Sequence, residues 1–431
     1  MGRGWNASLP TVGRTALRLD FPRARLEVLL MLELTEAQQR ILAAIQVLPF
    51  ESVSLKDSLG RVLAEPILSQ MDLPRFDNSA VDGYAVLAND LVSASQENPV
   101  ALRLVGKISA GDSSVVKLNP GGCVRIFTDS PLPAGADAVA MQEDTQVDSS
   151  NRERISLLDA VKPWENIRFR GEDVKTGSTL GEAGARLSVG QLSLLGAVGI
   201  ETVRVGRQPV VGLLATGSEL REAGQPLGAS EIYESNRIAL AALTQKMGGV
   251  PKIFPLVADT LAETRSALET AFAQCDVVVT TGGVSVGELD FVKAAFEELG
   301  GKLDFWKVAI KPGKPFVFGQ LGEKFLFGLP GNPVSAFVTF ILLASPALGK
   351  MQGATSYSWP KQSSVLAERL ENRGDRRHFV RVIVDENGKA RSAGTQASHI
   401  LSALAHANGL VEIPPKTIFE TGRVVSVLRL D

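Results

Sequence analysis

The sequence predicts a multidomain α/β protein built around a doubly wound sheet, and three observations carry this prediction. At 431 residues the chain is longer than one hydrophobic core normally supports, so several domains are expected. From Pro209 onward, apolar runs of strand length alternate with helical segments of ten or more residues, which is typical of a parallel sheet covered by helices. Between Leu73 and Lys162, short apolar runs separated by turn residues indicate a small β-rich module.

The first thirty residues differ in composition from the rest of the chain. They are rich in arginine and have no clear periodicity, so we expect residues 1–30 to form a disordered extension. The arginines interrupt any apolar signal-peptide core, whereas an arginine-rich organelle-targeting segment stays open as an alternative. After Met31, apolar residues at helical spacing behind a Thr-Glu-Ala-Gln start predict a capped helix over residues 35–48.

Regular strands and helices are predicted for residues 209–348. The expected strands are residues 210–215, 252–257, 277–280, 305–310, 316–318 and 325–329. The expected helices are residues 236–247, 261–272, 291–299 and a closing helix from about 333 to 348. A helix over residues 189–195 and a strand at 203–205 precede this region, and alternating segments at 379–384 and 424–428 predict a carboxy-terminal β domain.

Charge and composition exclude several functional classes. A formal net charge of -2 gives no reason to expect nucleic-acid or membrane binding. The two cysteines, Cys123 and Cys275, are far apart, which disfavours disulfides and zinc sites and fits a cytoplasmic location. Three histidines, all after residue 377, leave little material for a histidine-ligated metal or a Ser-His-Asp triad. No run is expected to approach the roughly 18 uncharged apolar residues of a membrane span.

A glycine-rich turn at residues 282–287 is the strongest single indication of a ligand site. It follows a strand of three valines and two threonines and precedes a predicted helix. Such a turn lets backbone N–H groups approach an anion without obstruction by side chains, and a tight turn without a ligand is the alternative.

Four further segments follow predicted strands and should share one edge of the sheet with this turn. They are residues 216–219, Asp259, residues 307–315 and residues 329–333. Because ligands of doubly wound sheets bind beyond the carboxyl ends of the strands, the five segments together predict an anionic-ligand site.

The side chains of these segments have the charges that such a site needs. Pro312, Gly313 and Pro315 restrict the backbone around Lys307, Lys311 and Lys314, so that three cations are presented in a fixed arrangement. Three carboxylates on the same edge, Glu219, Asp259 and Asp290, would repel an anion unless a divalent cation lies between them, which favours Mg²⁺. For Asp290, a helix N-cap is an equally good interpretation.

Two polar loops lie outside the α/β region. One is residues 74–85, between two apolar runs, and the other is residues 168–173, where two arginines stand beside two carboxylates. Loops of this kind are usually surface turns, so a function requires that something bring them to the glycine-rich edge.

Five segments of the sequence form recognisable motifs. They are Phe-Asp-Asn-Ser-Ala-Val-Asp-Gly-Tyr-Ala at residues 76–85, Arg-Gly-Glu-Asp at 170–173, Gly-Gly-Val-Ser-Val-Gly at 282–287, Lys-Pro-Gly-Lys-Pro at 311–315 and Leu-Pro-Gly-Asn-Pro-Val-Ser-Ala at 329–336. In these segments the sequence resembles the molybdopterin molybdenumtransferase (MoeA) family, which includes the carboxy-terminal part of gephyrin. They occur in the family's order, and the likeness covers about residues 34–430.

The resemblance implies four domains and a homodimer. The implied domains are a discontinuous elongated domain over residues 31–72 and 163–206, a β-rich insert over 73–162, a molybdopterin-binding α/β domain over 207–352 and a β-barrel domain over 353–431. In the family the active site lies between the α/β domain of one subunit and the elongated and inserted regions of the other. This would bring the loops at 74–85 and 168–173 to the glycine-rich edge.

The implied reaction is insertion of molybdate into adenylylated molybdopterin with Mg²⁺-dependent release of AMP. Residues matching functionally important family positions are Asp82, Thr128, Asp173, Glu219, Asp259, Asp290, Lys307 and Lys311, of which Glu219, Asp259 and Asp290 would bind Mg²⁺. Residues expected to bind substrate are Gly282, Gly283, Ser285, Gly287, Lys314, Pro330, Pro333, Arg168, Arg377 and Ser398. Transient contact with molybdopterin adenylyltransferase and recipient molybdoenzymes is also expected.

The sequence departs from the family pattern at two positions. Thr128 is followed by Asp129 where the family usually has glycine, and Asp is among the residues that best tolerate a left-handed conformation. Ser218 stands where the family often has Asp or Asn, which leaves Glu219 as the carboxylate of that turn. Two other functions stay open, namely molybdopterin adenylyltransferase and a non-catalytic molybdopterin-binding scaffold.

Overall fold

The computed structural model describes residues 31–112, 116–147, 150–284 and 291–431, so the predicted extension over 1–30 lies outside the described residues. The chain divides into two compact units. Unit 1 consists of the described residues up to Val47, Gln208–Met351 and Tyr357–Asp431, and unit 2 consists of Leu48–Arg207 and Gln352–Ser356.

A six-stranded sheet with the order β16-β13-β17-β21-β20-β18 is the centre of unit 1. Its strands are β13 (Val210–Ala215), β16 (Val250–Ile253), β17 (Val277–Thr281), β18 (Lys302–Lys307), β20 (Pro315–Leu321) and β21 (Lys324–Leu329). Every residue of β17 is buried, as expected for a central strand of valines and threonines. The predicted doubly wound α/β domain is therefore confirmed.

The expectation of a wholly parallel sheet is wrong at one side. Strand β20 runs antiparallel to both β21 and β18, while β16, β13, β17 and β21 are parallel. The reason is the two-residue turn between Leu321 and Lys324, because so short a connection can only join antiparallel strands. The strand predicted over residues 305–310 is also divided, since β18 ends at Lys307 and β19 (Ile310–Lys311) joins another sheet.

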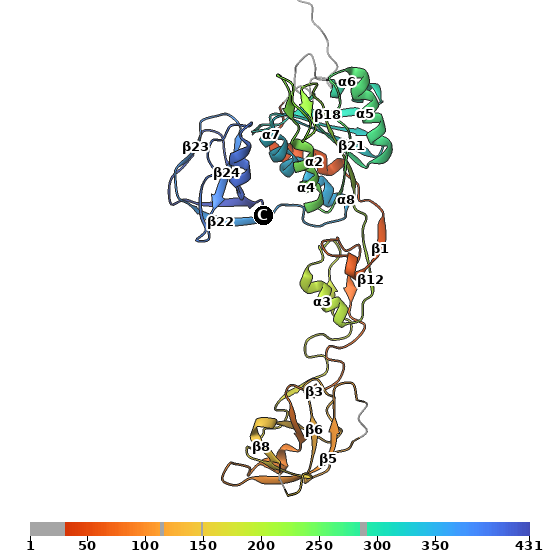
Figure 1. Ribbon diagram of the computed structural model, residues 1–431, viewed down its shortest axis with the longest axis vertical. Helices are drawn as coiled ribbons and strands as arrows, with labels where there is room; N and C mark the ends of the chain where they lie inside the picture. Colours follow the sequence, from red (N-terminus) through yellow and green to blue (C-terminus); the bar gives the residue numbers. More distant parts are fainter. Residues whose placement is uncertain (1–30, 113–115, 148–149, 285–290) are drawn as a thin grey trace, which may run out of the picture. The chain divides into compact units, whose positions relative to one another are not determined.

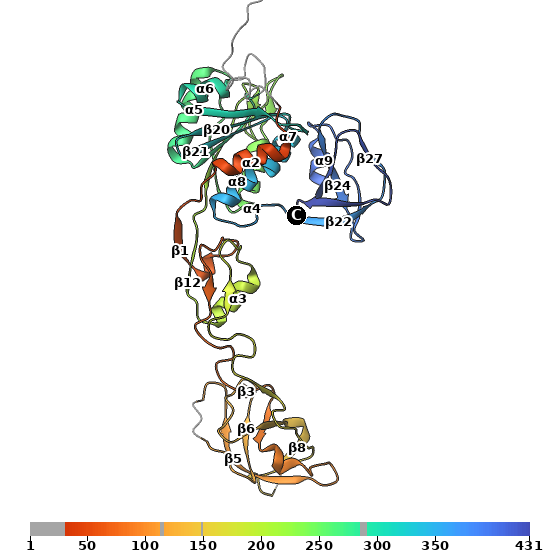
Figure 2. The ribbon, with the colours of Figure 1, turned by 180° about the vertical axis from the view of Figure 1, so that it is seen from behind.

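Helices cover both faces of this sheet (Figures 1 and 2). They are α2 (Leu34–Ala44), α4 (Asn236–Lys246), α5 (Leu261–Gln274), α6 (Val292–Glu298), α7 (Pro333–Thr339), the π-helix η4 (Phe340–Ala344) and α8 (Ser345–Met351). On one face, Leu268 and Phe272 of α5 and Phe296 of α6 pack on Val278 and Leu326 of the sheet. Successive side chains of β17 and β21 point to opposite faces of the sheet, so a shift of one residue would move Val278 and Leu326 away from these helices. This packing therefore fixes the register of the two strands.

Among the described residues, one helical segment is long and apolar enough to cross a membrane. It is Pro333–Met351, which combines α7, η4 and α8, and 83% of its most apolar window is buried inside the structure. The expectation that no run of the chain reaches this length is therefore wrong. Because its apolar side chains are already covered by the α/β domain, we interpret the segment as a core helix.

The carboxy-terminal part of unit 1 is a closed β-barrel, as predicted. Its strands are β22 (Lys361–Leu366), β24 (Arg377–Val384), β25 (Lys389–Ser392), β26 (Gly409–Ile413) and β28 (Val424–Arg429). A pairing between β24 and β26 closes the barrel, and β19 extends it at β24. The short pair β23 (Leu370–Asn372) and β27 (Thr417–Phe419) and the helix α9 (Leu401–His406) complete this part.

Unit 2 contains a six-stranded sheet and three short strand pairs. The sheet has the order β7-β4-β6-β5-β9-β8 and comprises β4 (Gly83–Val86), β5 (Val100–Ile108), β6 (Gly122–Ile126), β7 (Ala138–Met141), β8 (Thr145–Val147) and β9 (Arg154–Leu157). The pairs are β1 (Phe50–Ser54) with β12 (Thr202–Gly206), β2 (Ile67–Leu68) with β11 (Thr179–Gly181), and β3 (Asn78–Ser79) with β10 (Ile167–Arg168). Helix α3 (Val189–Ala197) begins with a complete capping box at Ser188.

Candidate functional site

Four of the five predicted loops meet at the carboxyl edge of the central sheet. The amide of Gly282 donates to the carbonyl of Leu329 (3.2 Å), and the amide of Gly217 donates to the carbonyl of Val257 (3.1 Å). A Cβ added to Gly331 would lie 3.7 Å from the Cα of Gly282. The loops after β13, β16, β17 and β21 are thus in mutual contact, as the positions of the strands along the chain predict.

Gly282 and Gly283 allow this contact because neither could carry a side chain. Gly282 has a φ of 84° and Gly283 a φ of 62°, and both are in the left-handed region that favours glycine. A Cβ on Gly282 would approach the carbonyl oxygen of Thr216 to 2.6 Å, and one on Gly283 would approach its Oγ1 to 2.9 Å. That Oγ1 is buried and has no hydrogen-bond partner among the described residues. A polar group is therefore left unsatisfied directly beside the two glycines.

Two of the three predicted metal-binding carboxylates, Glu219 and Asp259, lie in the part of the chain that the structure describes. Asp259 accepts from the amide of Ser218 through Oδ2 (2.9 Å), and its own amide donates to Ser218 Oγ (3.2 Å). The exposed carboxylate of Glu219 lies over Gly217, since a Cβ there would be 2.9 Å from each of its oxygens. Asp290, Ser285 and Gly287 lie outside the described residues. Among the residues the structure describes, no three His, Cys, Asp or Glu side chains form a metal-binding group.

The lysines follow the end of β18 on the same edge. Lys307 Nζ lies 3.8 Å from the ring centroid of Trp306, and Lys293 Nζ of α6 lies 3.9 Å from the same ring. An indole face attracts ammonium groups by its quadrupole, so Trp306 holds two cations near the edge. The carbonyl oxygen of Lys314 accepts from the amide of Val308 (3.1 Å), the residue directly after β18.

Lys311 lies beside a buried histidine. Lys311 pairs with His378 in the ladder between β19 and β24, and His378 is 6% exposed with no partner for Nε2 within the described part of the chain. Burial is the main reason that the pKa of His378 is lowered to about 4, and the charges of Lys311, Arg381 and Arg376 contribute to the same shift. The imidazole is therefore neutral at pH 7, and the fixed charge around it is positive.

Ser398 reaches the start of α7. Its carbonyl oxygen accepts from the amide of Val334 (3.2 Å), directly after Pro333. Asn236 Nδ2 donates to the carbonyl of Gly331 (2.8 Å), which fixes the turn between Pro330 and Pro333 from the side of α4. The terminal barrel thereby contributes to the same edge as the glycine-rich loop.

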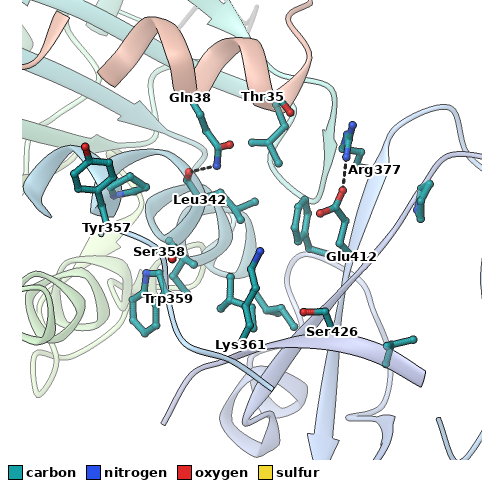
Figure 3. Close-up of a pocket in the computed structure, with 18 of the residues that line it drawn as sticks. Thr35, Gln38, Leu342, Tyr357, Ser358, Trp359, Lys361, Arg377, Glu412 and Ser426 are labelled. Atoms are coloured by element: carbon teal, nitrogen blue, oxygen red, sulfur yellow. Dashed lines mark hydrogen bonds and ion pairs between the residues drawn. The ribbon is translucent and has the colours of Figure 1, made fainter. Parts of the chain in front are cut away.

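Arg377 lines a separate cavity of about 590 Å³ between α2, η4 and the barrel (Figure 3). Its Nη1 donates to Oε1 of Glu412 (2.5 Å), and its Nε lies 3.7 Å from Oε2 of Glu33. Other polar residues of the cavity include Gln38, Lys361 and Ser426. The side chain of Arg377 thus faces a cavity lined by no other predicted site residue of the described chain, while its backbone amide donates to the carbonyl of Ala309 (3.2 Å) in the 307–315 segment.

Unit 2 brings the two polar loops together through the pairing of β3 with β10. In that ladder Asn78 lies opposite Arg168 and Ser79 opposite Ile167. A third segment joins them, because Ser79 donates from its amide to the carbonyl of Ser130 (3.1 Å) and accepts from the amide of Asp129 (2.9 Å). Residues 77–82, 128–132 and 167–173 therefore form one cluster, which we call the unit 2 cluster.

Asp82 and Thr128 are directly bonded in the unit 2 cluster. Oδ1 of Asp82 accepts from the amide (2.8 Å) and from Oγ1 (2.9 Å) of Thr128. The amide of Thr128 is the main reason that the pKa of Asp82 is below its usual value, with its hydroxyl and the charge of Arg125 adding to the effect. Asp82 thus presents an ionised carboxylate with Oδ2 available.

Asp129 has the left-handed conformation that its position requires. Its φ is 65°, and its Oδ1 accepts from Nη1 of Arg168 (2.7 Å). The turn therefore survives the replacement of the family's usual glycine, and the new carboxylate partly neutralises a predicted anion-binding arginine. Asp173 is exposed, and its amide donates to the carbonyl of Leu73 (3.1 Å), which fixes it beside the other loop.

Comparison with known proteins covers nearly the whole described chain. The MoeA N-terminal region (domain I and II) matches residues 32–199, the probable molybdopterin binding domain matches 212–350 and the MoeA C-terminal region (domain IV) matches 363–430. This chain belongs to the MoeA family. Its domains occur in the order that the five sequence segments predict.

Several MoeA relatives are similar over most of their length. The molybdopterin molybdenumtransferase of Haemophilus influenzae is 41% identical over 387 residues, which are 88% of this chain and 93% of that protein. The protein of the same name from Bacillus subtilis is 38% identical over 88% of this chain and 89% of its own length. A crystal structure of the MoeA protein from Pyrococcus horikoshii OT3 matches with a TM-score of 0.78 and 34% identity, over 92% of this chain and 99% of that one.

Three residues around the candidate site were not predicted from the sequence. Trp306, His378 and Arg381 hold or surround predicted residues without belonging to a recognisable motif. For Arg381 a signal existed, since it interrupts the apolar run Phe-Val-Arg-Val-Ile-Val at residues 379–384, and a charge in a buried strand needs several partners.

Proposed function

We propose that this chain inserts molybdate into adenylylated molybdopterin with release of AMP, giving molybdenum cofactor. The observation that supports this most directly is the set of loops at one sheet edge, with cations beside a glycine turn, in a chain of the MoeA family. Molybdate is a dianion and the second substrate carries phosphates, so a site for both needs fixed donors and cations. The relatives named molybdopterin molybdenumtransferase support the same reaction.

The glycine-rich edge of unit 1 would bind the phosphate and molybdate groups. Gly282 and Gly283 keep side chains away from the place where an oxyanion would enter, and the buried, unsatisfied Thr216 hydroxyl lies beside them. Lys307, Lys311 and Lys314 would supply positive charge, and Ser398 with the Pro330 and Pro333 turn would close the opposite side. Ser285 and Gly287, which lie outside the described residues, are proposed to bind the same groups.

Glu219 and Asp259 fit a Mg²⁺ ion by their chemistry. Asp259 uses Oδ2 for an amide of the first turn, which leaves Oδ1 for a ligand, and both oxygens of Glu219 lie at the same turn. Such hard carboxylate oxygens, with Asp290 as the proposed third ligand, suit magnesium. When bound, Mg²⁺ would neutralise phosphate charge and so favour departure of AMP.

The unit 2 cluster would complete the site in a homodimer. Asp82, Thr128 and Asp173 are exposed or half-buried and are held by the loops that carry them. Arg168, and in the separate cavity Arg377, would bind an oxyanion only by sharing their guanidinium groups with the carboxylates that now hold them. We propose that the cluster of one subunit serves the glycine-rich edge of its partner.

The state of the two cysteines is consistent with the proposed cytoplasmic location. Both cysteines are free and buried, and burial raises the pKa of Cys123 to about 12, so the thiol stays protonated and chemically inert. We propose transient contact with the adenylyltransferase that supplies the substrate and with the molybdoenzymes that receive the product.

The proposal is tested by measuring AMP release from adenylylated molybdopterin with molybdate and Mg²⁺. We expect turnover that requires both ions, and a protein that binds the pterin without releasing AMP would instead be a scaffold. Asp290→Ala should abolish AMP release and leave a folded dimer, as judged by circular dichroism and light scattering. Retained turnover in Asp290→Ala would refute the assignment of that residue.

A further inference from the structure

A buried arginine lies directly behind the Ser398 side of the proposed site. Arg381 of β24 is 1% exposed and is among the largest fully buried side chains of the chain. Among the described residues no carboxylate pairs with its guanidinium. Burying a cation without a counter-charge is unfavourable, so the surrounding groups must offset its charge in another way.

The loop over residues 395–400 supplies the partners of Arg381. The Nη2 atom donates to the carbonyls of Thr395 (2.9 Å) and Ala397 (3.1 Å), and Nη1 donates to the carbonyl of Ile400 (2.9 Å). Three carbonyl oxygens around one planar guanidinium determine the path of the loop on both sides of Ser398.

Gln396 completes the attachment. Its Oε1 accepts from the backbone amide of Arg381 (2.9 Å) and from Nε (3.3 Å), and its Nε2 donates to the carbonyl of Arg381 (3.1 Å). The side-chain amide thus joins the loop to both the backbone and the side chain of one strand residue. Such a fully bonded network is rigid, because loss of any member leaves a buried polar group unsatisfied.

The same loop carries Ser398 to α7. The carbonyl of Ser398 accepts from the amide of Val334 (3.2 Å), and Leu401 and Leu404 of α9 meet Pro333 and Asn236 around a cavity of only about 20 Å³. Arg381 also contributes to the positive charge that surrounds His378, together with Lys311 and Arg376. The cation that fixes the loop therefore belongs to a concentration of charge that suits an oxyanion.

We propose that Arg381 is a positioning residue for oxyanion binding: it fixes the 395–400 loop so that Ser398 reaches the molybdate, and adds buried positive charge behind it. This inference rests on the proposed function. It goes further in assigning part of the affinity for molybdate to a network on β24 that does not itself touch the substrate.

The test uses Arg381→Lys, which keeps the charge but loses the planar set of donors. We expect the KM for molybdate in AMP release to rise about tenfold, with kcat and the KM for adenylylated molybdopterin changing less than about threefold. The matched control is Arg429→Lys in the same barrel, whose arginine binds Gln362 and Asp431, and it should leave all three constants within about twofold. An unchanged molybdate KM in Arg381→Lys would overturn the proposal.

A double-mutant cycle separates positioning from a loss of folding. If Arg381 acts through Ser398, its substitution in a Ser398→Ala background should raise the molybdate KM by less than about twofold. Equal factors in both backgrounds would show that Arg381 acts independently of Ser398 and would also overturn the proposal.

A second variant and a second readout cover the remaining outcomes. Should Arg381→Lys fail to fold, Gln396→Ala keeps the cation and loosens the loop, and it should give the same rise in molybdate KM. Hydrogen exchange of the amides at 395–400 should be faster in either variant, and molybdate should protect them less than in the wild type. If the wild type releases no AMP, the proposed function fails, whereas unchanged exchange and protection in the variants refute the role of Arg381.

Discussion

Substitution of Gly282 by alanine tests whether the close approach of two loops determines the glycine-rich edge. Gly282 has a φ of 84°, and a Cβ there would lie 2.6 Å from the carbonyl oxygen and 2.9 Å from Oγ1 of Thr216. Two effects should therefore add, namely backbone strain and a steric overlap with a neighbouring strand end. Thr216 cannot move away easily, because its amide donates to the carbonyl of Thr281 (3.0 Å).

Gly300 provides a control for the first effect alone. Its φ is 85°, and a Cβ there would meet nothing within 4 Å. Gly300→Ala should lower the free energy of unfolding by about 1–2 kcal/mol, the usual cost of a left-handed alanine. Gly282→Ala should add about 1–3 kcal/mol for the overlap. This additional loss in Gly282→Ala corresponds to a Tm about 2–12 °C lower than that of Gly300→Ala for a unit of this size.

The assay is differential scanning calorimetry of both variants, because the two units can unfold in separate transitions. Fluorescence of Trp306 and Trp359 reports on unit 1, to which both glycines belong. Gly282→Ala should also lose AMP release, while Gly300→Ala retains it. Equal decreases in Tm for the two variants would refute the argument that the Thr216 contact requires glycine at position 282.

Two further predictions concern titrating groups. Thr128→Val removes the hydroxyl but keeps the amide that bonds Asp82, so the pKa of Asp82 should rise towards its ordinary value. In the wild type, ionised Asp82 stabilises the fold above the ordinary pKa, and this stability is lost as pH falls through the lowered pKa. The variant should therefore gain less stability from this ionisation. Carboxyl NMR titration checks this, and an unchanged pKa would contradict it. His378, with a pKa of about 4 against 6.5 unfolded, binds protons more readily when unfolded, so stability should fall by about 2 kcal/mol from pH 7 to 4.5. In urea unfolding, His378→Gln should lose less stability between pH 7 and 4.5 than the wild type, whereas substitution of the exposed His399 by Gln should change nothing. An equal dependence of the unfolding free energy on pH in the wild type and both variants would contradict the prediction.

The sequence predicts those parts of the fold and site that depend on local patterns. A buried strand of valines followed by glycines specifies β17 and its turn, and the order of strands and helices places four loops on one edge. Contacts between loops that are far apart in the sequence are harder to predict. The contact of Asp129 with Arg168 joins residues 39 positions apart, and no periodicity in the sequence predicts it.

The antiparallel strand β20 shows how local signals can conflict. Alternation of strands and helices up to residue 299 favours a parallel sheet, but no helix separates β18, β20 and β21. The short turn at Gly322 makes β20 antiparallel to β21, and β18 is antiparallel to β20, so β18 runs parallel to β21 and ends at the carboxyl edge. The end of β18 therefore lies at the edge where a wholly parallel sheet would place it, although β20 has the opposite direction. The same geometry allows β19 to leave the sheet after Lys307 and pair with β24, which places Lys311 beside the barrel strand that carries Arg381.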